Sequence, residues 1–405
     1  MLHLSGMLSG LSVEERRGFW AAVVVCLAIF FADASHSVVI PIFPAFAEGL
    51  GANLALIGIY GSAVGVAMVL LSVPIGGISD KVGRKSVMLL GCVLLAVVPI
   101  LYIISKEPLH LLIARLLLGI AQGSTFSIGF IWVSETAPAR AKNLLQGLYM
   151  TTMGLGFTVG PILGGYASST WGYSAAFIIS SALGVVGLIF LLFAKETPSR
   201  HVRDTRRIGF REAMLNPRVF AAGVSNFVNT LTYSALITFF PLYGVFLGLT
   251  SSQIGLCFTI RGLISTAVRF PAGAVSRGKT AFKLMVISLA VSAVMLFLLA
   301  ISPSLILLLL ILAIIGVAYG IFLTTGNVYV TQEATPEHRG AAMGIYSSFG
   351  NMSNVVSPLL LGGIAQIWGL ETTFKVTAIA ALIGVFAIII ISRRSTESEF
   401  VSRKP

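Results

Sequence analysis

The stretch SVMLLGCVLLAVVPILYIIS, residues 86–105, carries no charge over its whole length, although Arg84 and Lys85 precede it and Lys106 follows it. An α-helix needs about 20 predominantly apolar residues to cross the hydrocarbon core of a bilayer. This stretch therefore predicts a membrane-spanning helix with basic residues at both ends. Similar apolar runs follow one another along the whole chain.

We predict twelve spanning helices from these runs, at residues 19–46, 54–79, 86–105, 108–134, 145–168, 173–194, 218–246, 251–276, 281–301, 304–332, 341–366 and 371–392. Hydrophobic residues make up 56% of the chain and charged residues only 10%, whereas soluble domains contain roughly 25% charged residues. Twelve helices and their loops use up the 405 residues and leave no room for a separate soluble domain. The predicted fold class is an all-α membrane protein.

The Lys and Arg residues are distributed unevenly, and their distribution predicts the orientation. If both termini are cytoplasmic, most of the 27 Lys and Arg residues fall in inner segments, and the outer loops keep only Lys106 and Lys375. This is the bias that the positive-inside rule describes. Topology then explains the net charge of +12, so we expect the lipid bilayer and no nucleic acid as a partner. We predict a multi-pass protein of the cytoplasmic membrane with both termini inside.

The three cysteines, Cys26, Cys92 and Cys257, all lie in apolar runs. They lack the spacing of a disulfide framework, a redox pair or a metal site. We therefore expect neither a metal ion nor a cofactor.

A shift of 197 residues aligns the first half of the chain with the second and pairs Gly, Pro and aromatic residues that composition alone would not match. The pairs include Pro44/Pro241, Gly58/Gly255, Pro74/Pro271, Gly119/Gly316, Gly123/Gly320, Tyr149/Tyr346, Pro161/Pro358 and Trp171/Trp368. Six helices per repeat is an even number, so both halves enter the membrane from the same side. They are then parallel repeats related by a pseudo-twofold axis along the membrane normal.

The repeat predicts how the chain is divided. A polar, basic segment interrupted by Pro198 and Pro217 separates the halves. We expect an N-terminal six-helix bundle at 1–194, a cytoplasmic linker at 195–217, a C-terminal six-helix bundle at 218–392 and a cytoplasmic tail at 393–405. Two bundles joined in this way can rock about a site between them, which provides alternating access.

A cluster of glycine, acidic and basic residues follows the second predicted helix and reads Gly76-Gly-Ile-Ser-Asp80-Lys81-Val-Gly83-Arg84-Lys85. It resembles the signature of the major facilitator superfamily, Gly-x-x-x-Asp-(Arg/Lys)-x-Gly-(Arg/Lys)-(Arg/Lys). The resemblance implies the major facilitator fold and a gating role for this loop, with Asp80 near the N-terminus of the helix that begins near Ala341. Glu135 resembles the family's acidic partner of the motif's arginine, here Arg84. The alternative is that these are only loop charges that set the topology.

The second half departs from this signature. Its matching stretch reads Gly273-Ala-Val-Ser276-Arg277-Gly278-Lys279 and has no acid in the place of Asp80. Glu333 and Arg339 indicate that some charge pairing remains there.

The fifth predicted helix contains a series of small residues, Gly147, Gly156, Gly160, Pro161, Gly164 and Gly165. This series matches the antiporter motif of facilitator-family exporters at every Gly and Pro, so the resemblance implies export rather than import. Small residues permit close helix contact, and proline frees a backbone carbonyl and bends the helix. The alternative is a purely structural packing role.

Asp33 is the only acid that lies well inside a predicted span. Burial in a low-dielectric environment favours the neutral form of a carboxylic acid, so a carboxyl group in this place can bind and release a proton near neutral pH. The sequence from Phe30 to Pro44 resembles the first helix of drug–proton antiporters, including tetracycline exporters. His36 lies three residues on and shares the face of Asp33. We predict proton coupling at both; the alternatives are a structural Asp–Arg pair and a packing histidine.

Arg115 begins the stretch RLLLGIAQG, which resembles the helix-4 motif of the superfamily and implies proton transfer or substrate contact. The residue lies roughly 10 Å below the outer start of its helix. A cation at that depth costs a few kcal/mol and normally faces the bundle interior. A snorkelling structural arginine is the alternative.

Arg261, near the middle of the eighth predicted helix, is a second unusual charge. It can pair with Asp33 or meet an acidic group of a substrate, and the sequence leaves both open. Further candidates come from helices 4, 7 and 10, which line the central cavity in the family that the chain resembles: Gln122, Asn226, Asn229, Tyr233, Asn327 and Tyr329.

The sequence contains no nucleotide-binding P-loop, so we expect an ion gradient to supply the energy. We predict a monomeric secondary active transporter, not an enzyme, that exports small lipophilic compounds or drugs in exchange for protons. Uptake or exchange of a metabolite, sugar or organic anion is the alternative.

Overall fold

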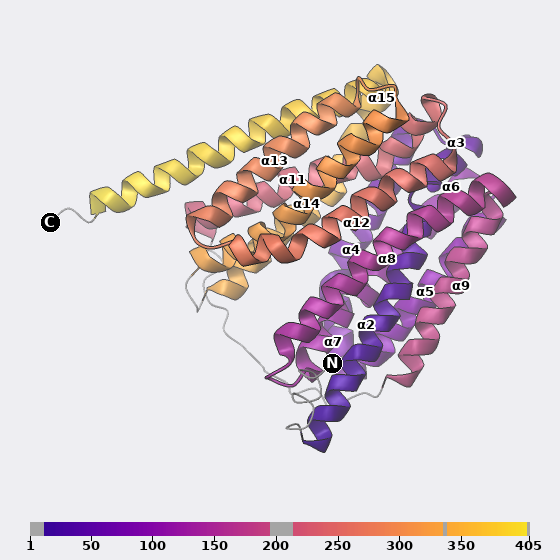
Figure 1. The fold of residues 1–405 in the computed structure, drawn as a ribbon. Helices are drawn as coiled ribbons and strands as arrows, with labels where there is room; N and C mark the ends of the chain where they lie inside the picture. Colours follow the sequence, from indigo (N-terminus) through magenta and orange to yellow (C-terminus); the bar gives the residue numbers. More distant parts are fainter. Residues whose placement is uncertain (1–11, 195–213, 335–337, 403–405) are drawn as a thin grey trace. The chain divides into compact units, whose positions relative to one another are not determined.

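The computed structural model describes residues 12–194, 214–334 and 338–402. Within these ranges all regular structure is helical (Figure 1). The helices are α2 Val13–Val39, α3 Phe43–Gly49, α4 Leu54–Val82, α5 Arg84–Ile104, α6 Pro108–Gln122, the π-helix η1 Gly123–Ser127, α7 Ile128–Thr136, α8 Lys142–Trp171, α9 Tyr173–Phe193, α11 Pro217–Phe246, α12 Ser251–Val275, α13 Lys279–Leu299, α14 Leu305–Glu333 and α15 Arg339–Ser402. Most of the predicted linker, residues 195–213, lies outside the described residues.

The predicted all-α architecture of twelve membrane helices is confirmed. Nine helices of the described chain are long and apolar enough to cross a membrane, and α6, η1 and α7 together form one of them. α15 is one of these nine, although Gly369 divides it into two helices. The remaining two long helices, α8 and α11, have 30 residues each and contain several polar residues.

The first span differs from its prediction. We expected one helix over 19–46, but α2 ends at Val39 and α3 begins at Phe43. Pro41 and Pro44 explain the interruption, because proline lacks the N–H that a continuous helix needs. The helix also starts earlier than expected, at Val13, because Ser12 and Glu15 form a capping box.

Glycines with positive φ make matching turns in the two halves. Gly51 (φ 91°) and Gly248 (φ 79°) precede α4 and α12, and Gly172 (φ 85°) and Gly369 (φ 82°) end α8 and the first part of α15. Both pairs are separated by the shift of 197 residues. Only glycine adopts this region without strain, so the turns explain why these positions repeat.

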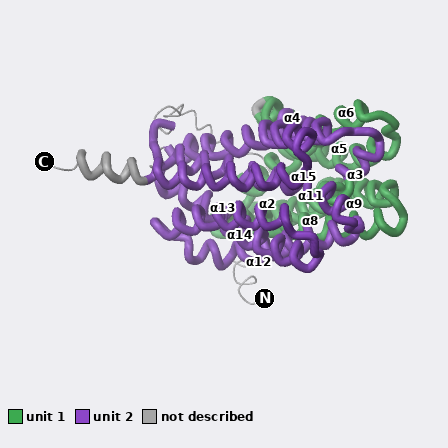
Figure 2. Tube along the Cα trace, turned by 90° about the horizontal axis from the view of Figure 1, so that it is seen from above, with its two compact units in different colours: residues 1–42, 67–203 green, residues 43–66, 204–405 purple. Residues whose placement is uncertain are grey.

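The described helices fall into two compact units (Figure 2). Unit 1 comprises residues 1–42 and 67–203, and unit 2 comprises residues 43–66 and 204–405. The first part of α4 thus belongs to unit 2, where it packs on α15: Ser62 Oγ donates to the carbonyl of Val355 at 2.6 Å. The observed units differ in this respect from the predicted bundles, and the boundaries of those bundles remain a proposal.

Within unit 1, α2 runs beside α8 and α9 (Figure 1). Reciprocal hydrogen bonds join α2 to α9, since Ser35 Oγ donates to the carbonyl of Ser180 and Ser180 Oγ donates to that of Ser35, both at 2.7 Å. Within unit 2, α11 packs along α15. Ser353 Oγ donates to the carbonyl of Phe227 at 2.9 Å. In the first half a Cβ at Gly156 would meet the carbonyl of Phe30, the residue that matches Phe227.

Candidate functional site

The buried carboxylate of Asp33 lies where α2 is pressed against α8. The residue is 7% exposed and is the only Asp or Glu that is buried in the described part of the chain. A Cβ at Gly156 would lie 3.0 Å from Asp33 Cβ and 2.6 Å from the carbonyl of Phe30. The glycine of the motif therefore lets α8 approach the helical turn that carries the acid. Asp33 is also close enough to Tyr149 on α8 for an electrostatic interaction.

Two further glycines continue this contact along α2. A Cβ at Gly160 would lie 2.6 Å from the carbonyl of Ala34, and one at Gly164 would collide with the backbone of Val38. The spacing of four residues places all three glycines on one face of α8. By contrast, a Cβ at Gly147 has nothing within 4 Å. Pro161 and Gly165 are also buried.

A second cluster of polar side chains in unit 1 lies around His36. The amide nitrogen of Gln122 lies 3.1 Å from Nε2 and 3.2 Å from Nδ1 of the imidazole, so it donates to whichever ring nitrogen carries the lone pair. The charge of Arg115 acts on both His36 and Tyr102. The structure thus brings three predicted residues together and adds Tyr102, which the sequence did not single out.

The π-helix η1 begins directly after Gln122. It replaces one turn of the fourth span between α6 and α7, and a Cβ at Gly91 of α5 would meet the side chain of Thr125 in η1. Single π-turns inside α-helices occur often at functional sites. Here the turn adjoins the residue that bonds His36.

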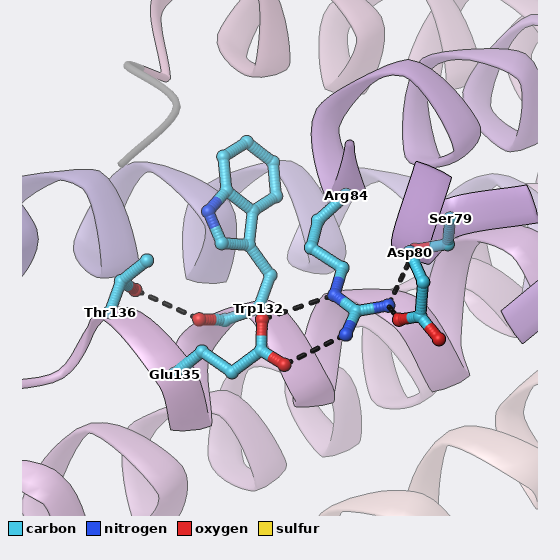
Figure 3. A network of polar contacts seen from close by, with 6 residues as sticks. All are labelled: Ser79, Asp80, Arg84, Trp132, Glu135 and Thr136. Atoms are coloured by element: carbon cyan, nitrogen blue, oxygen red, sulfur yellow. Dashed lines mark hydrogen bonds and ion pairs between the residues drawn. The ribbon is translucent and has the colours of Figure 1, made fainter. Parts of the chain in front are cut away.

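Arg84 is the centre of a charged network at one end of unit 1 (Figure 3). Its Nε and Nη2 donate to the two oxygens of Glu135 at 3.0 and 2.8 Å. Its Nη1 lies 2.6 Å from Asp80 Oδ1 and donates to Ser79 Oγ at 2.9 Å. The two-pronged contact with Glu135 fixes the guanidinium geometrically as well as electrostatically. This network joins the loop before α5 to the end of α7.

The other residues of this loop have different roles. Lys85 Nζ donates to the carbonyls of Leu192 and Ala194 at 2.8 Å each, so its charge is placed at the C-terminus of α9, where the helix dipole favours a cation. Gly83 has a φ of 92° and makes the turn between α4 and α5. Gly76 has open space beside it, and Lys81 is exposed.

In the matching loop of unit 2, a neutral side chain takes the place of the acid that binds Arg84 in unit 1. Gln332, which matches Glu135, accepts a hydrogen bond from the backbone N–H of Gly278 at 3.0 Å. Glu333 pairs with Arg218 at 3.0 Å. Some charge pairing is therefore present at this end of unit 2, and the partner of Glu333 is an arginine of α11.

Arg261 lies inside unit 2 and is 1% exposed. Its guanidinium carbon is 5.0 Å from the ring centre of Tyr233 and 4.5 Å from that of Tyr319, and the two rings are nearly parallel, at 13°. With Asn229 and Ser292, these side chains line a small cavity between α11, α12, α13 and α14. The structure thus brings together three residues predicted for a substrate cavity.

The other cavity candidates lie elsewhere. Asn226 donates to the carbonyl of Tyr346 at 2.8 Å and joins α11 to α15. Asn327 is exposed and donates to Leu323 of its own helix, and Tyr329 packs against Phe282 in the core of unit 2. Tyr319 was not predicted, although the shift of 197 residues pairs it with Gln122.

Comparisons with known proteins agree with this arrangement. The sequence model of the Major Facilitator Superfamily matches residues 25–282 and 222–405 in two overlapping segments. An uncharacterized MFS-type transporter of Methanocaldococcus jannaschii is 22% identical over 378 residues, which are 91% of this chain and 98% of that protein. The multidrug resistance protein MdtG of Klebsiella pneumoniae is 23% identical over 368 residues, covering 88% of this chain and 89% of that protein.

A solved structure has the same fold. It is the inward-facing, occupied form of a bacterial homologue of the human lysosomal transporter Spinster, with a TM-score of 0.79 and 15% identity, and the match covers 95% of this chain and 98% of that one. At this identity the likeness concerns the fold. Because the family's sequence model covers nearly the whole chain, the protein belongs to the Major Facilitator Superfamily and is a multi-pass membrane transporter of small molecules.

Proposed function

We propose that the protein exports small lipophilic compounds across the cytoplasmic membrane in exchange for protons, by alternating access. The observation that carries this proposal is the contact between Asp33 and the glycines of α8. A buried carboxylate changes its charge when it binds a proton, and the free energy of burying it changes with its charge. Such a change on α2 is transmitted directly to α8, because Gly156 leaves no side chain between the two helices.

The names of relatives support the proposed class of exported compounds. MdtG of Klebsiella pneumoniae is named a multidrug resistance protein, and the glycine series of α8 matches the motif that exporters of the family share. We assign proton coupling to Asp33, with His36, Gln122 and Arg115 as a neighbouring polar relay. We assign gating to the network of Asp80, Arg84 and Glu135.

Everted membrane vesicles test the proposal. The vesicles are acidified inside, and a panel of lipophilic dyes and drugs is added while a pH-sensitive fluorophore reports the internal pH. An exporter that exchanges protons releases protons when a substrate is added, and the release saturates with substrate. Vesicles with the Asp33→Asn variant should give no release. Vesicles with Glu107→Gln, which changes an exposed acid of unit 1, should behave like the wild type.

A proton release that is unchanged in the Asp33→Asn variant would contradict the assignment of this residue. No release for any compound of the panel would contradict proton-coupled export of lipophilic compounds. The second candidate, uptake or exchange of a metabolite, sugar or organic anion, would then be favoured. The buried cation of Arg261 supports the organic anion among these.

A further inference from the structure

The hydroxyl of Tyr149 on α8 reaches the backbone of the fourth span at the π-turn. It donates a hydrogen bond to the carbonyl of Phe126 in η1 at 2.6 Å, and its second hydrogen-bonding neighbour is the backbone of Phe130 in α7. In an uninterrupted α-helix, the carbonyl of residue 126 and the N–H of residue 130 pair with each other. A side chain that inserts at such a place in the ladder distorts a helix. The tyrosine hydroxyl therefore favours the π-turn.

A glycine leaves room for a tyrosine hydroxyl in both halves of the chain. A Cβ at Gly129 would lie 3.0 Å from the hydroxyl of Tyr149, and one at Gly326 would meet the hydroxyl of Tyr346. The shift of 197 residues relates the two glycines and the two tyrosines. The contact between tyrosine and glycine is therefore part of the repeated scaffold.

The π-turn and the bond to its carbonyl do not follow this repeat. The matching part of the second half lies in α14, which is α-helical throughout. The carbonyl that matches Phe126 is that of Leu323, and it accepts a hydrogen bond from the side chain of Asn327 at 2.8 Å. Unit 1 thus has a π-turn held by a tyrosine, where unit 2 has a regular helix. Unit 1 is also the half that contains Asp33 and His36.

Asp33 lies one helical turn from the hydroxyl of Tyr149. The Cβ position at Gly129 is 3.0 Å from this hydroxyl and 3.2 Å from Cδ1 of Ile29, so the hydroxyl lies near the Ile29 side chain. Ile29 precedes Asp33 by four residues, which is about 6 Å along α2, on the same face. A charge acts over such a distance in a protein interior, where the effective dielectric constant is low.

The other end of the π-turn leads to His36. Gln122 is the last residue before η1, and its amide nitrogen lies 3.1 Å from Nε2 of His36. Each residue of an α-helix turns the side-chain direction by about 100°. Gain or loss of the π-turn therefore changes the direction of Gln122 relative to α7. Two predicted proton-coupling groups border the same turn, His36 through Gln122 and Asp33 through Tyr149.

We propose that Tyr149 is a positioning residue that transmits the protonation state of Asp33 to the π-turn and so to the amide of Gln122. A hydroxyl has a single hydrogen to donate, and an ionised carboxylate is a stronger acceptor than a carbonyl. The charged form of Asp33 competes with the Phe126 carbonyl for this hydrogen more strongly than the protonated form does. The inference rests on the proposed proton coupling and adds how its two groups of residues communicate.

Other titratable groups face the same region and must be separated from Asp33. Those that act electrostatically on the Tyr149 ring, besides Asp33, are the thiols of Cys26 on α2 and Cys92 on α5. α2 also carries His36, α7 ends with Glu135 bound to Arg84, and α9 begins with Tyr173. A titration between about pH 5 and 8 avoids the usual ionisation range of thiols and phenols. An Asp33→Asn variant then identifies the part of any change that depends on Asp33.

The fluorescence of Trp132 reports on α7, and it tests the proposal with the full chain purified in detergent. Figure 3 shows this residue in the same helix as Glu135. Trp132 is 1% exposed and follows Phe130 by two residues, whereas the other three tryptophans, Trp20, Trp171 and Trp368, are exposed. Replacing those three by Phe leaves Trp132 as the only fluorophore. We expect its emission to change with pH, and Asp33→Asn to remove part of that change.

The Tyr149→Phe variant removes the hydroxyl and keeps the ring. The change in emission that depends on Asp33 should be lost, so that adding Asp33→Asn has no further effect. Gly129→Ala, which displaces the hydroxyl without removing it, should also reduce this change. Tyr346→Phe is the matched control and should keep the change in full, because its hydroxyl lies against a regular helix. The apparent Tm and the size-exclusion profile report whether each variant is folded.

Three outcomes overturn the proposal: no change that depends on Asp33 in the background variant, an unaltered change in Tyr149→Phe, or an equal loss in Tyr346→Phe. A merely structural tyrosine would lower the Tm and leave the titration as it was. The proposed function is judged separately, by substrate-induced proton release from vesicles. A titration that is lost in Tyr149→Phe, without any such release in the wild type, supports this inference and contradicts proton-coupled export. Proton release together with an unaltered titration in Tyr149→Phe has the opposite meaning.

Discussion

The substitution Gly160→Ala tests the close contact between α8 and α2. The new Cβ would lie 2.6 Å from both the carbonyl oxygen of Ala34 and Cβ of Ser37, whereas ordinary contacts between such atoms begin at about 3.5 Å. The helices must therefore separate locally by several tenths of an ångström. Overpacking of this kind costs about 1–3 kcal/mol, and the better helix propensity of alanine returns at most about 1 kcal/mol. We expect a net loss of about 1–2 kcal/mol.

Thermal unfolding of the purified protein in detergent measures this loss. For a domain of 150–250 residues, 1 kcal/mol corresponds to roughly 2–4 °C, so the apparent Tm of the Gly160→Ala variant should fall by about 2–8 °C. Gly147→Ala is the matched control, because it changes a glycine of the same helix and the same motif whose Cβ would meet nothing within 4 Å. Its apparent Tm should stay constant or rise slightly.

Equal shifts in the two variants would refute the reasoning, because the whole difference between them is the contact with α2. An unchanged Tm in Gly160→Ala would have the same meaning. Proton-driven transport should fall in Gly160→Ala and stay close to that of the wild type in Gly147→Ala, since Gly160 packs against the helical turn of α2 that follows Asp33.

Two other contacts give predictions of their own. Glu135→Gln should lower the apparent Tm by a few degrees, corresponding to about 1 kcal/mol, because Arg84 loses a charged acceptor at 2.8 Å that is only 25% exposed. This fall in Tm should become smaller at high salt. A fall that does not depend on salt would contradict the ionic explanation. Ser180→Ala removes one side of the reciprocal bonds with Ser35, and a double-mutant cycle with Ser35→Ala should show a coupling of about 0.5–1.5 kcal/mol; strictly additive effects would contradict it.

The helical architecture could be predicted from the sequence because a bilayer imposes its own thickness on every span. Runs of about 20 apolar residues have few alternatives to a spanning helix. The ends were less predictable. The interruption between Val39 and Phe43 depends on two prolines, and proline is often accommodated inside membrane helices, as Pro74 and Pro161 are here.

The arrangement of the candidate site could be predicted only in part. The unusual charges Asp33 and Arg261 stand out in an apolar chain whatever its fold. Their neighbours depend on the rotation of each helix about its axis, which the order of residues does not determine when apolar residues surround the helix on all sides. The contact of Gly156 with Asp33 and the stacking of Tyr319 on Tyr233 are of this kind.

The repeat also relates the side-chain contacts of the two halves. Once His36 and Gln122 are known to touch, the shift of 197 residues leads directly to Tyr233 and Tyr319. Contacts in one half therefore predict contacts in the other, even where the residue types differ.

We propose that Asp33 couples export to the entry of protons, and the most direct test is the concentration ratio that the transporter maintains. One proton moving through 100 mV supplies about 2.3 kcal/mol, which corresponds to a substrate gradient of roughly 50-fold per exchanged proton. Liposomes that contain the wild type or the Glu107→Gln variant should reach a substrate gradient of this order under an imposed proton-motive force of about 100 mV. The Asp33→Asn variant should bring the substrate no further than equal concentrations on both sides. A gradient in that variant equal to that of the wild type would contradict the account.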